Sequence, residues 1–134
     1  MSRDSERKFF ILMSHKMTES QKRDAISSFG VTQFIEVPNR WWGQIPPNAD
    51  SIVSYIEDIL NFLEKRSEKG DIILVQGDFG ATFYIACWAK KHDLLPVYAT
   101  TERVAIESVD GEKIITTREF KHVRFRVYET EKEI

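Results

Sequence analysis

Four short segments in the first hundred residues have the apolar pattern of β-strands. Residues 9–13 and 71–75 are apolar almost throughout, which is typical of strands that are buried on both faces of a parallel sheet. Residues 33–37 and 96–100 are the other two segments. The stretches between these strands have the features of helices, so we predict alternating strands and helices.

Each predicted helix has a recognisable beginning or end. Thr18 and Gln21 have the spacing of a capping box that begins a short helix, and Gly30 ends it. A longer helix is predicted from about residue 50 to residue 67, and a third follows residues 76–82. We therefore predict an α/β chain with a Rossmann-like three-layer fold and a mostly parallel central sheet.

The pattern changes in the last third of the chain, where apolar and polar residues alternate. Residues 103–108 and 113–117 flank Asp110 and Gly111, a pair typical of a hairpin turn. Residues 122–129 alternate strictly, so we expect a C-terminal antiparallel β extension. On this strand we expect Val123, Phe125 and Val127 to face one way, and His122, Arg124, Arg126 and Tyr128 to face the other.

The length, net charge and cysteine content of the chain indicate its domain number, partners and compartment. The 134 residues are enough for one domain, and we expect residues 9–134 to form it behind a flexible tail of residues 1–8. The net charge of -2 gives no overall attraction to nucleic acid, so we expect no DNA partner. No apolar run is as long as a membrane span, and the single cysteine, Cys87, suits a reducing compartment. We therefore expect a cytoplasmic protein with no membrane partner.

Residues 76–82, Gln-Gly-Asp-Phe-Gly-Ala-Thr, form the most informative motif. They join a buried strand to a helix, and open α/β sheets hold phosphates and nucleotides at such glycine-rich turns. The motif lacks the Gly-Lys-Ser/Thr of a Walker loop, and it has only Gly77 and Gly80 of the dinucleotide-binding glycines. It therefore predicts a ligand at the carboxyl edge of the sheet without identifying that ligand.

Ser14 and His15 end the first strand, so we expect them at the same edge of the sheet as Asp78. His15 could act as a general acid or base and Ser14 could donate to a phosphate oxygen, although both are also ordinary loop residues. Asp78 could orient a ribose hydroxyl or a catalytic group, or it could only bond to its own turn. These three residues are the candidate catalytic residues.

Candidate ligand-binding residues follow from the same geometry. Thr82 could hold a phosphate in the first turn of its helix, or merely begin that helix. Arg103 has the planar fork that binds two phosphate oxygens, although arginine is also common at the start of an exposed strand. The basic residues from 121 to 126 could bind anions or only protect an edge strand. The predicted ligand-binding residues are Gly77, Phe79, Gly80, Thr82, Thr100, Thr101, Arg103, Lys121 and Arg124.

Trp41 and Trp42 lie in a long predicted loop, where large aromatic side chains need an explanation. They could stack on bases, form a subunit contact or cover the core. The three histidines are scattered along the chain, so the sequence has no metal-ligand spacing and we expect neither a metal nor a cofactor.

Several segments of the chain together match the pattern of one protein family. They are the strand that ends in Ser14 and His15, and residues 44–47, 75–82, 98–103 and 120–126. In these segments the chain resembles the small CRISPR-associated proteins of the Csx-twenty family, from about Phe9 to Tyr128. That family is related to the CARF group of Rossmann-like sensor domains. It is grouped with the ring nucleases, which degrade the cyclic oligoadenylate messengers of type III CRISPR defence.

The resemblance implies both a ligand and a reaction. The ligand would be a cyclic oligoadenylate, cyclic tetra-adenylate first of all. A ribose 2′-hydroxyl would attack the adjacent phosphorus without a metal, leaving a 2′,3′-cyclic phosphate end and switching the signal off. Because a ring of four adenylates has two-fold symmetry, it would suit a homodimer. A non-catalytic sensor or sponge for the ring, and a protein or RNA interaction module, are the alternatives.

Overall fold

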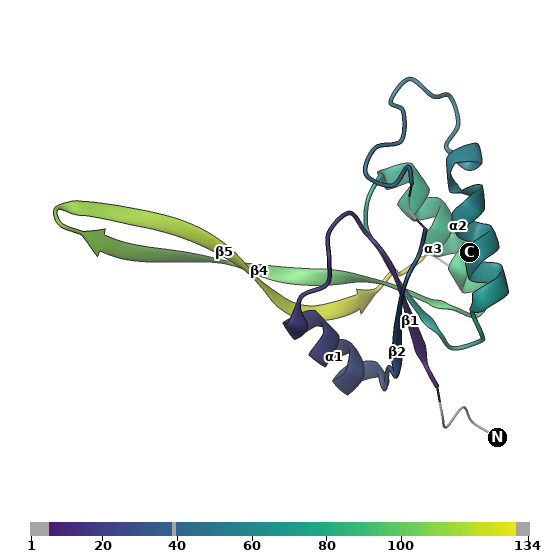
Figure 1. Ribbon diagram of the computed structural model, residues 1–134, viewed down its shortest axis with the longest axis horizontal. Coiled ribbons are helices and arrows are strands. Elements are labelled where there is room, and N and C mark those ends of the chain that lie inside the picture. Colours follow the sequence, from purple (N-terminus) through teal and green to yellow (C-terminus); the bar gives the residue numbers. More distant parts are fainter. Residues whose placement is uncertain (1–5, 39, 131–134) are drawn as a thin grey trace.

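The computed structural model describes residues 6–38 and 40–130 of the chain. They form a mixed α/β fold around a five-stranded sheet with the strand order β2-β1-β3-β4-β5 (Figure 1). The first four strands are parallel, and β5 runs antiparallel to β4. The predicted α/β class, the mostly parallel sheet and the antiparallel C-terminal pair are confirmed. The strands are β1 (Lys8–Leu12), β2 (Gln33–Glu36), β3 (Ile72–Val75), β4 (Leu95–Asp110) and β5 (Lys113–Val127).

Helices lie against both faces of this sheet (Figure 1). One core joins α1 to Phe9 and Ile11 of β1, and the other joins α2 and α3 to Phe10 and Leu12. Because successive side chains of a strand point to opposite faces, β1 supplies both cores, which explains its unbroken apolar run. None of the helices in the described ranges is long and apolar enough to cross a membrane. The helices are α1 (Glu19–Phe29), α2 (Val53–Arg66) and α3 (Phe79–Lys91).

The ends of α1 are formed by the predicted capping residues. Thr18 Oγ1 accepts a hydrogen bond from the backbone N–H of Gln21 at 3.1 Å, and the Gln21 side chain accepts one from the Thr18 N–H at 2.9 Å. Gly30, with a left-handed φ of 68°, caps the other end. The capping box satisfies N–H groups that no helical carbonyl reaches, so α1 begins at a defined place after β1.

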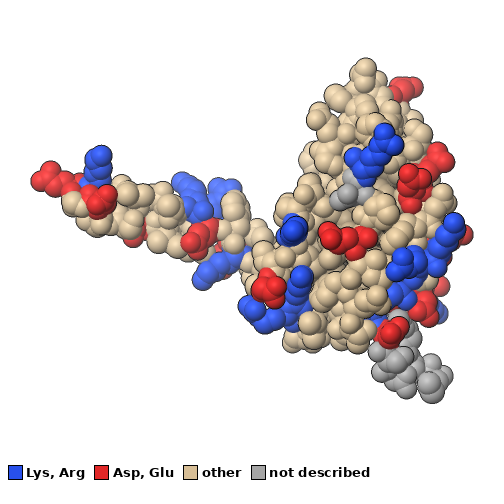
Figure 2. Space-filling view, in the orientation of Figure 1, with Lys and Arg blue, Asp and Glu red and all other residues tan. Residues whose placement is uncertain are grey.

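The strands β4 and β5 extend well beyond the rest of the sheet as a two-stranded hairpin (Figure 1). We call residues 101–122, which include its turn, the arm. The segments 96–100 and 103–108 were predicted as separate strands, but they form one strand because β5 pairs with β4 along its whole length. Gly111, with a φ of 66°, makes the turn at the predicted place. Acidic side chains gather at the tip of the arm (Figure 2).

Arg7 and Lys8, which were predicted to lie in a flexible tail of residues 1–8, belong to the folded domain. Arg7 donates from Nε to the carbonyl of Gly70 and from Nη1 to the carbonyl of Phe29, both at 2.8 Å. Lys8 opens β1, and its N–H donates to the buried carboxylate of Asp71 at 3.0 Å. These contacts make both residues part of the domain, while residues 1–5 lie outside the described ranges.

Trp42 covers the core from the loop between β2 and α2. Its side chain is buried, and Nε1–H donates to the carbonyl of Gln76 at 2.7 Å. The ring lies directly on Gly77, where an added Cβ would stand 2.5 Å from Trp42 Nε1. Trp41 is partly exposed and contacts the ring of Tyr55 edge to face. For Trp42, the structure therefore supports the core-covering alternative.

The contact between Trp42 and Gly77 gives a test of the fold. Gly77→Ala should lower the free energy of unfolding by about 1–3 kcal/mol, the usual cost of overpacking a core, because the tryptophan ring has to move. Gly43→Ala is the matched control, since a Cβ there has no atom within 4 Å. Urea unfolding of both variants and the parent would check this. Equal midpoints for the parent and Gly77→Ala would show that Trp42 does not depend on this glycine.

Candidate functional site

The carboxyl ends of β1 and β3 lie side by side in the sheet. The connection after β1 leads to α1 on one face of the sheet. The connection after β3 leads to α3 on the opposite face, so the two connections diverge between these strands. Open α/β sheets bind ligands at such a switch point. The predicted residues after β1 and β3 therefore lie at one edge of the sheet but on opposite faces of it.

A pocket of about 550 Å³ lies on the α1 face, between the start of α1 and the base of the arm. We call it the α1 pocket. Of the predicted site residues, it brings together His15, Thr101 and Lys121, which come from the β1–α1 loop, β4 and β5. The full set of lining residues is His15, Lys16, Thr18, Ser20, Gln21, Thr101, Phe120, Lys121 and His122.

The α1 pocket has the chemistry of an anion site. Lys16 and Lys121 carry positive charges at its wall. The capped N-terminus of α1, at Thr18, adds a partial positive charge and backbone N–H groups. Glu19, in the first turn of α1, and Asp24, behind His122, are opposing charges, but neither is among the lining residues. A phosphate or a carboxylate would be stabilised in this pocket.

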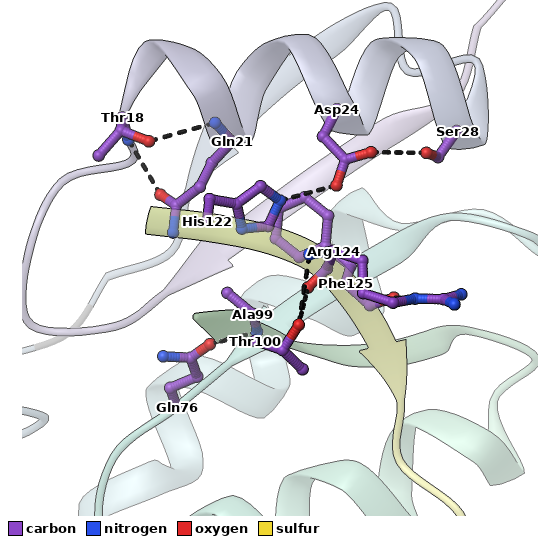
Figure 3. Close-up of polar contacts among 10 residues, drawn as sticks. All are labelled: Thr18, Gln21, Asp24, Ser28, Gln76, Ala99, Thr100, His122, Arg124 and Phe125. Atoms are coloured by element: carbon purple, nitrogen blue, oxygen red, sulfur yellow. Dashed lines mark hydrogen bonds and ion pairs between the residues drawn. The ribbon is translucent and has the colours of Figure 1, made fainter. Parts of the chain in front are cut away.

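His122, in the wall of the pocket, is held by a hydrogen bond between β5 and α1 (Figure 3). His122 Nε2–H donates to Asp24 Oδ2 at 2.7 Å, and Ser28 donates to Asp24 Oδ1 at 2.6 Å. Burial raises the pKa of Asp24, but the bonds from Ser28 and His122 and the charges of His122 and Arg124 outweigh burial and lower it overall. Asp24 therefore remains a carboxylate that holds the His122 ring in one orientation.

A β-bulge places His122 on the α1 face. Thr100 pairs with Arg124, but Thr101 pairs with His122, so Val123 is an extra residue in β5. The predicted alternation is therefore wrong at this point: His122 does not share a face with Arg124. Bulges re-aim side chains in this way, and here the imidazole comes to lie against α1 and the ring of Phe125.

A second pocket, of about 660 Å³, lies beside α3 and contains other predicted residues. We call it the α3 pocket. Gly77, Phe79 and Thr82 line it, together with Tyr98 and Tyr128. Four of its lining side chains are aromatic, namely Phe79, Phe83, Tyr98 and Tyr128, and Phe79 is 94% exposed. The glycine motif and His15 were expected in one site, but they line different pockets because α1 and α3 pack on opposite faces.

The remaining predicted residues line neither of these two pockets, and some have structural roles. Asp78 is the N-cap of α3, where its Oδ2 accepts from the N–H of Ala81 at 3.0 Å. Thr100 bonds across the bulge to the backbone of Arg124. The guanidinium of Arg103 stacks over Phe120 at 5.4 Å, on the arm. Ser14, Gly80 and Arg124 are exposed.

The candidate site residues proposed from the sequence did not include Lys16 and His122, which line the α1 pocket, or Asp24, which holds His122. Lys16 directly follows His15, and its place between a strand end and a capping box is a signal that could have found it. Asp24 gave no signal, because its partner His122 is 98 residues away along the chain. Gln76 was also missed: its side chain accepts from the N–H of Ala99 at 2.6 Å and joins β3 to β4 where β4 leaves the sheet.

The fold and this pocket define an α/β protein with a cationic, ligand-sized site at the carboxyl edge of its sheet. The chain belongs to the family described as "Uncharacterized protein MJ1673 family", which matches residues 7–126. It is 44% identical over 124 residues to "Uncharacterized protein MJ1673" of Methanocaldococcus jannaschii, covering 90% of this chain and 96% of the relative. No solved structure matches the chain. Neither description names a ligand or a reaction, so the resemblance to ring nucleases stays a prediction.

The lowered pKa of Asp24 gives a test of the contact between Asp24 and His122. A carboxylate whose pKa is lower in the folded protein stabilises the fold above its unfolded pKa, ordinarily 3.8, and loses that contribution as the pH falls. The stability difference between the parent and Asp24→Asn should therefore shrink between about pH 5 and pH 3. Urea unfolding across this range checks it, with Asp58→Asn on the exposed face of α2 as the charge control. A difference that grows towards pH 3 would contradict the pairing.

Proposed function

We propose that the protein is a ring nuclease that binds a cyclic oligoadenylate in the α1 pocket and cleaves it. Cyclic tetra-adenylate is the first candidate ligand. The proposal includes a Rossmann-like three-layer domain of the CARF type, as the resemblance implies. The observation that carries it is the pocket itself, which Lys16, Lys121 and the N-terminus of α1 line together with His15 and His122.

This set of groups suits the cleavage of a ribose phosphodiester by its own 2′-hydroxyl. The reaction needs alignment of the attacking and leaving oxygens, stabilisation of charge on the phosphoryl oxygens, and proton transfer. Lys16, Lys121 and the N–H groups of α1 would stabilise the charge. His15, which is exposed at the pocket, would transfer a proton.

The volume of the pocket is consistent with a ligand shared between two copies of the chain. About 550 Å³ lies in the range of pockets for small molecules, and a ring of four nucleotides is larger than such a molecule. One pocket would hold one part of the ring, and the pocket of a two-fold related copy would hold the equivalent part. We therefore propose a homodimer.

The arm is the part of the surface that we propose for the dimer contact. An isolated two-stranded hairpin is at best marginally stable in water, and the arm exposes large apolar side chains. A second copy brings an identical apolar arm, so the two arms can cover each other by symmetry. The exposed apolar side chains of the arm are Ile106, Val109, Ile114, Ile115 and Phe120, with Val123 at its base.

Incubation with cyclic tetra-adenylate tests the proposed function. The parent should convert the ring to linear products with 2′,3′-cyclic phosphate ends, and the activity should persist in EDTA, because the substrate supplies the attacking oxygen. Chromatography of the products checks this. Lys121→Ala should weaken ring binding by about tenfold or more, the scale of losing one charge-assisted contact, while Lys113→Ala at the arm tip should not.

Each result of this assay separates the alternatives. Binding of the ring without cleavage would identify a sensor or sponge. If the protein neither binds nor cleaves the ring, the protein or RNA interaction module is the alternative that remains. Activity that is lost in EDTA and restored by Mg²⁺ would contradict the metal-free mechanism.

Light scattering tests the dimer. The parent should have twice the mass of the chain, and Val109→Lys with Ile114→Lys should convert it to a monomer, because four lysines would face one another across the two-fold axis. Val53→Lys, which replaces an exposed apolar residue on α2, away from the arm, should remain dimeric. A parent that is monomeric with and without the ring would rule out this arrangement.

A further inference from the structure

The second ring nitrogen of His122 is a buried polar atom with no hydrogen-bond partner within residues 6–38 and 40–130. Its side chain is only 4% exposed, and Nδ1 makes no hydrogen bond to any of the residues that the structure describes. Buried polar atoms are nearly always bonded, because leaving one unpaired costs about 1–3 kcal/mol. The position of this nitrogen beside the α1 pocket therefore needs an explanation.

Asp24, which is bonded to Nε2 of the His122 ring, determines whether Nδ1 carries a proton or a lone pair. Because the Asp24 carboxylate accepts from Nε2–H, the neutral imidazole carries its proton on Nε2 and a free lone pair on Nδ1. Ser28 fixes the carboxylate in turn, by donating to its second oxygen. A carboxylate that orients a histidine in this way is the arrangement found behind general bases in hydrolytic enzymes.

The residues around the pair are those that a phosphodiester reaction needs. His122 lines the same pocket as Lys121 and His15, which approach from β5 and the β1–α1 loop. The pocket therefore holds a buried, oriented imidazole, an exposed imidazole and cationic groups. Two imidazoles can share the work of removing one proton and supplying another.

We propose that His122 is the general base of the ring nuclease reaction, an inference that rests on the proposed function. The proton of the ribose 2′-hydroxyl passes to His122 Nδ1 as the 2′-oxygen forms its bond to phosphorus. The bond from phosphorus to the 5′-oxygen breaks, and protonated His15 supplies the proton to that oxygen. The products are a 2′,3′-cyclic phosphate and a 5′-hydroxyl, and no oxidant or metal is consumed.

Ligand entry has to uncover Nδ1, because the structure shields this atom from solvent. Phe120 and Lys121, its neighbours in the pocket wall, are exposed, so their side chains can move at little packing cost. Shielding in the free protein would keep water away from the base until a ligand arrives.

His122→Gln separates this role from a purely structural one. A glutamine amide N–H can still donate to Asp24 and hold α1 against β5, but it cannot take a proton. We expect His122→Gln to slow single-turnover cleavage of cyclic tetra-adenylate by about 10²–10⁴-fold, with ring affinity within a few-fold of the parent. His92→Gln, at the far end of α3, is the matched control and should cleave at the parent rate.

A spectroscopic measurement tests the orientation without relying on activity. Nitrogen-15 NMR of the parent imidazoles should show neutral His122 protonated on Nε2, and Asp24→Asn should shift protons towards Nδ1 and slow cleavage. A parent that cleaves, together with a His122→Gln variant that cleaves at the same rate, would overturn the base assignment and leave the proposed function standing. A parent that does not cleave the ring would overturn both.

Discussion

The hydrogen bond between Asp24 and His122 determines the geometry of the candidate site. It joins α1, early in the chain, to β5, near its end, at 2.7 Å. Without the bulge at Val123, His122 would point to the other face of the hairpin and α1 would have no polar partner on β5. Together with the packing of Phe29 on Phe125, this bond holds α1 beside the base of the arm, where Lys16 and Lys121 line the same pocket.

Much of the fold could be predicted from the sequence, because its determinants are local. The apolar run of β1 indicates a strand buried on both faces, and Thr18, Gln21 and Gly30 set the ends of α1 as expected. Gly111 makes the predicted turn. The length of the arm was not predictable in the same way, because its strands depend on pairing with each other rather than on an apolar pattern.

The site was predicted less well, because it depends on contacts between distant parts of the chain. His15 and Thr101 line one pocket, as the convergence of strand ends suggested, and Lys121 of the predicted basic patch lines it too. The glycine motif lines another pocket, because the face on which each helix packs is set by the crossover and not by the motif. Asp24 and the bulge could not be found from spacing, since each has meaning only when β5 lies against α1. The pocket chemistry favours an anion, and the proposed ligand comes only from the resemblance to ring nucleases.

NMR titration of the isotope-labelled protein with cyclic tetra-adenylate tests the central claim most directly, because it locates the ligand as well as detecting it. We predict shifts that saturate and map to the start of α1 and to Thr101, Lys121 and His122, with little change at Phe79 and Phe83 in the α3 pocket. Inorganic phosphate, as a small anion, should shift a subset of the same signals at higher concentration. An absence of shifts, or shifts confined to the α3 pocket, would contradict the claim that the α1 pocket is the binding site.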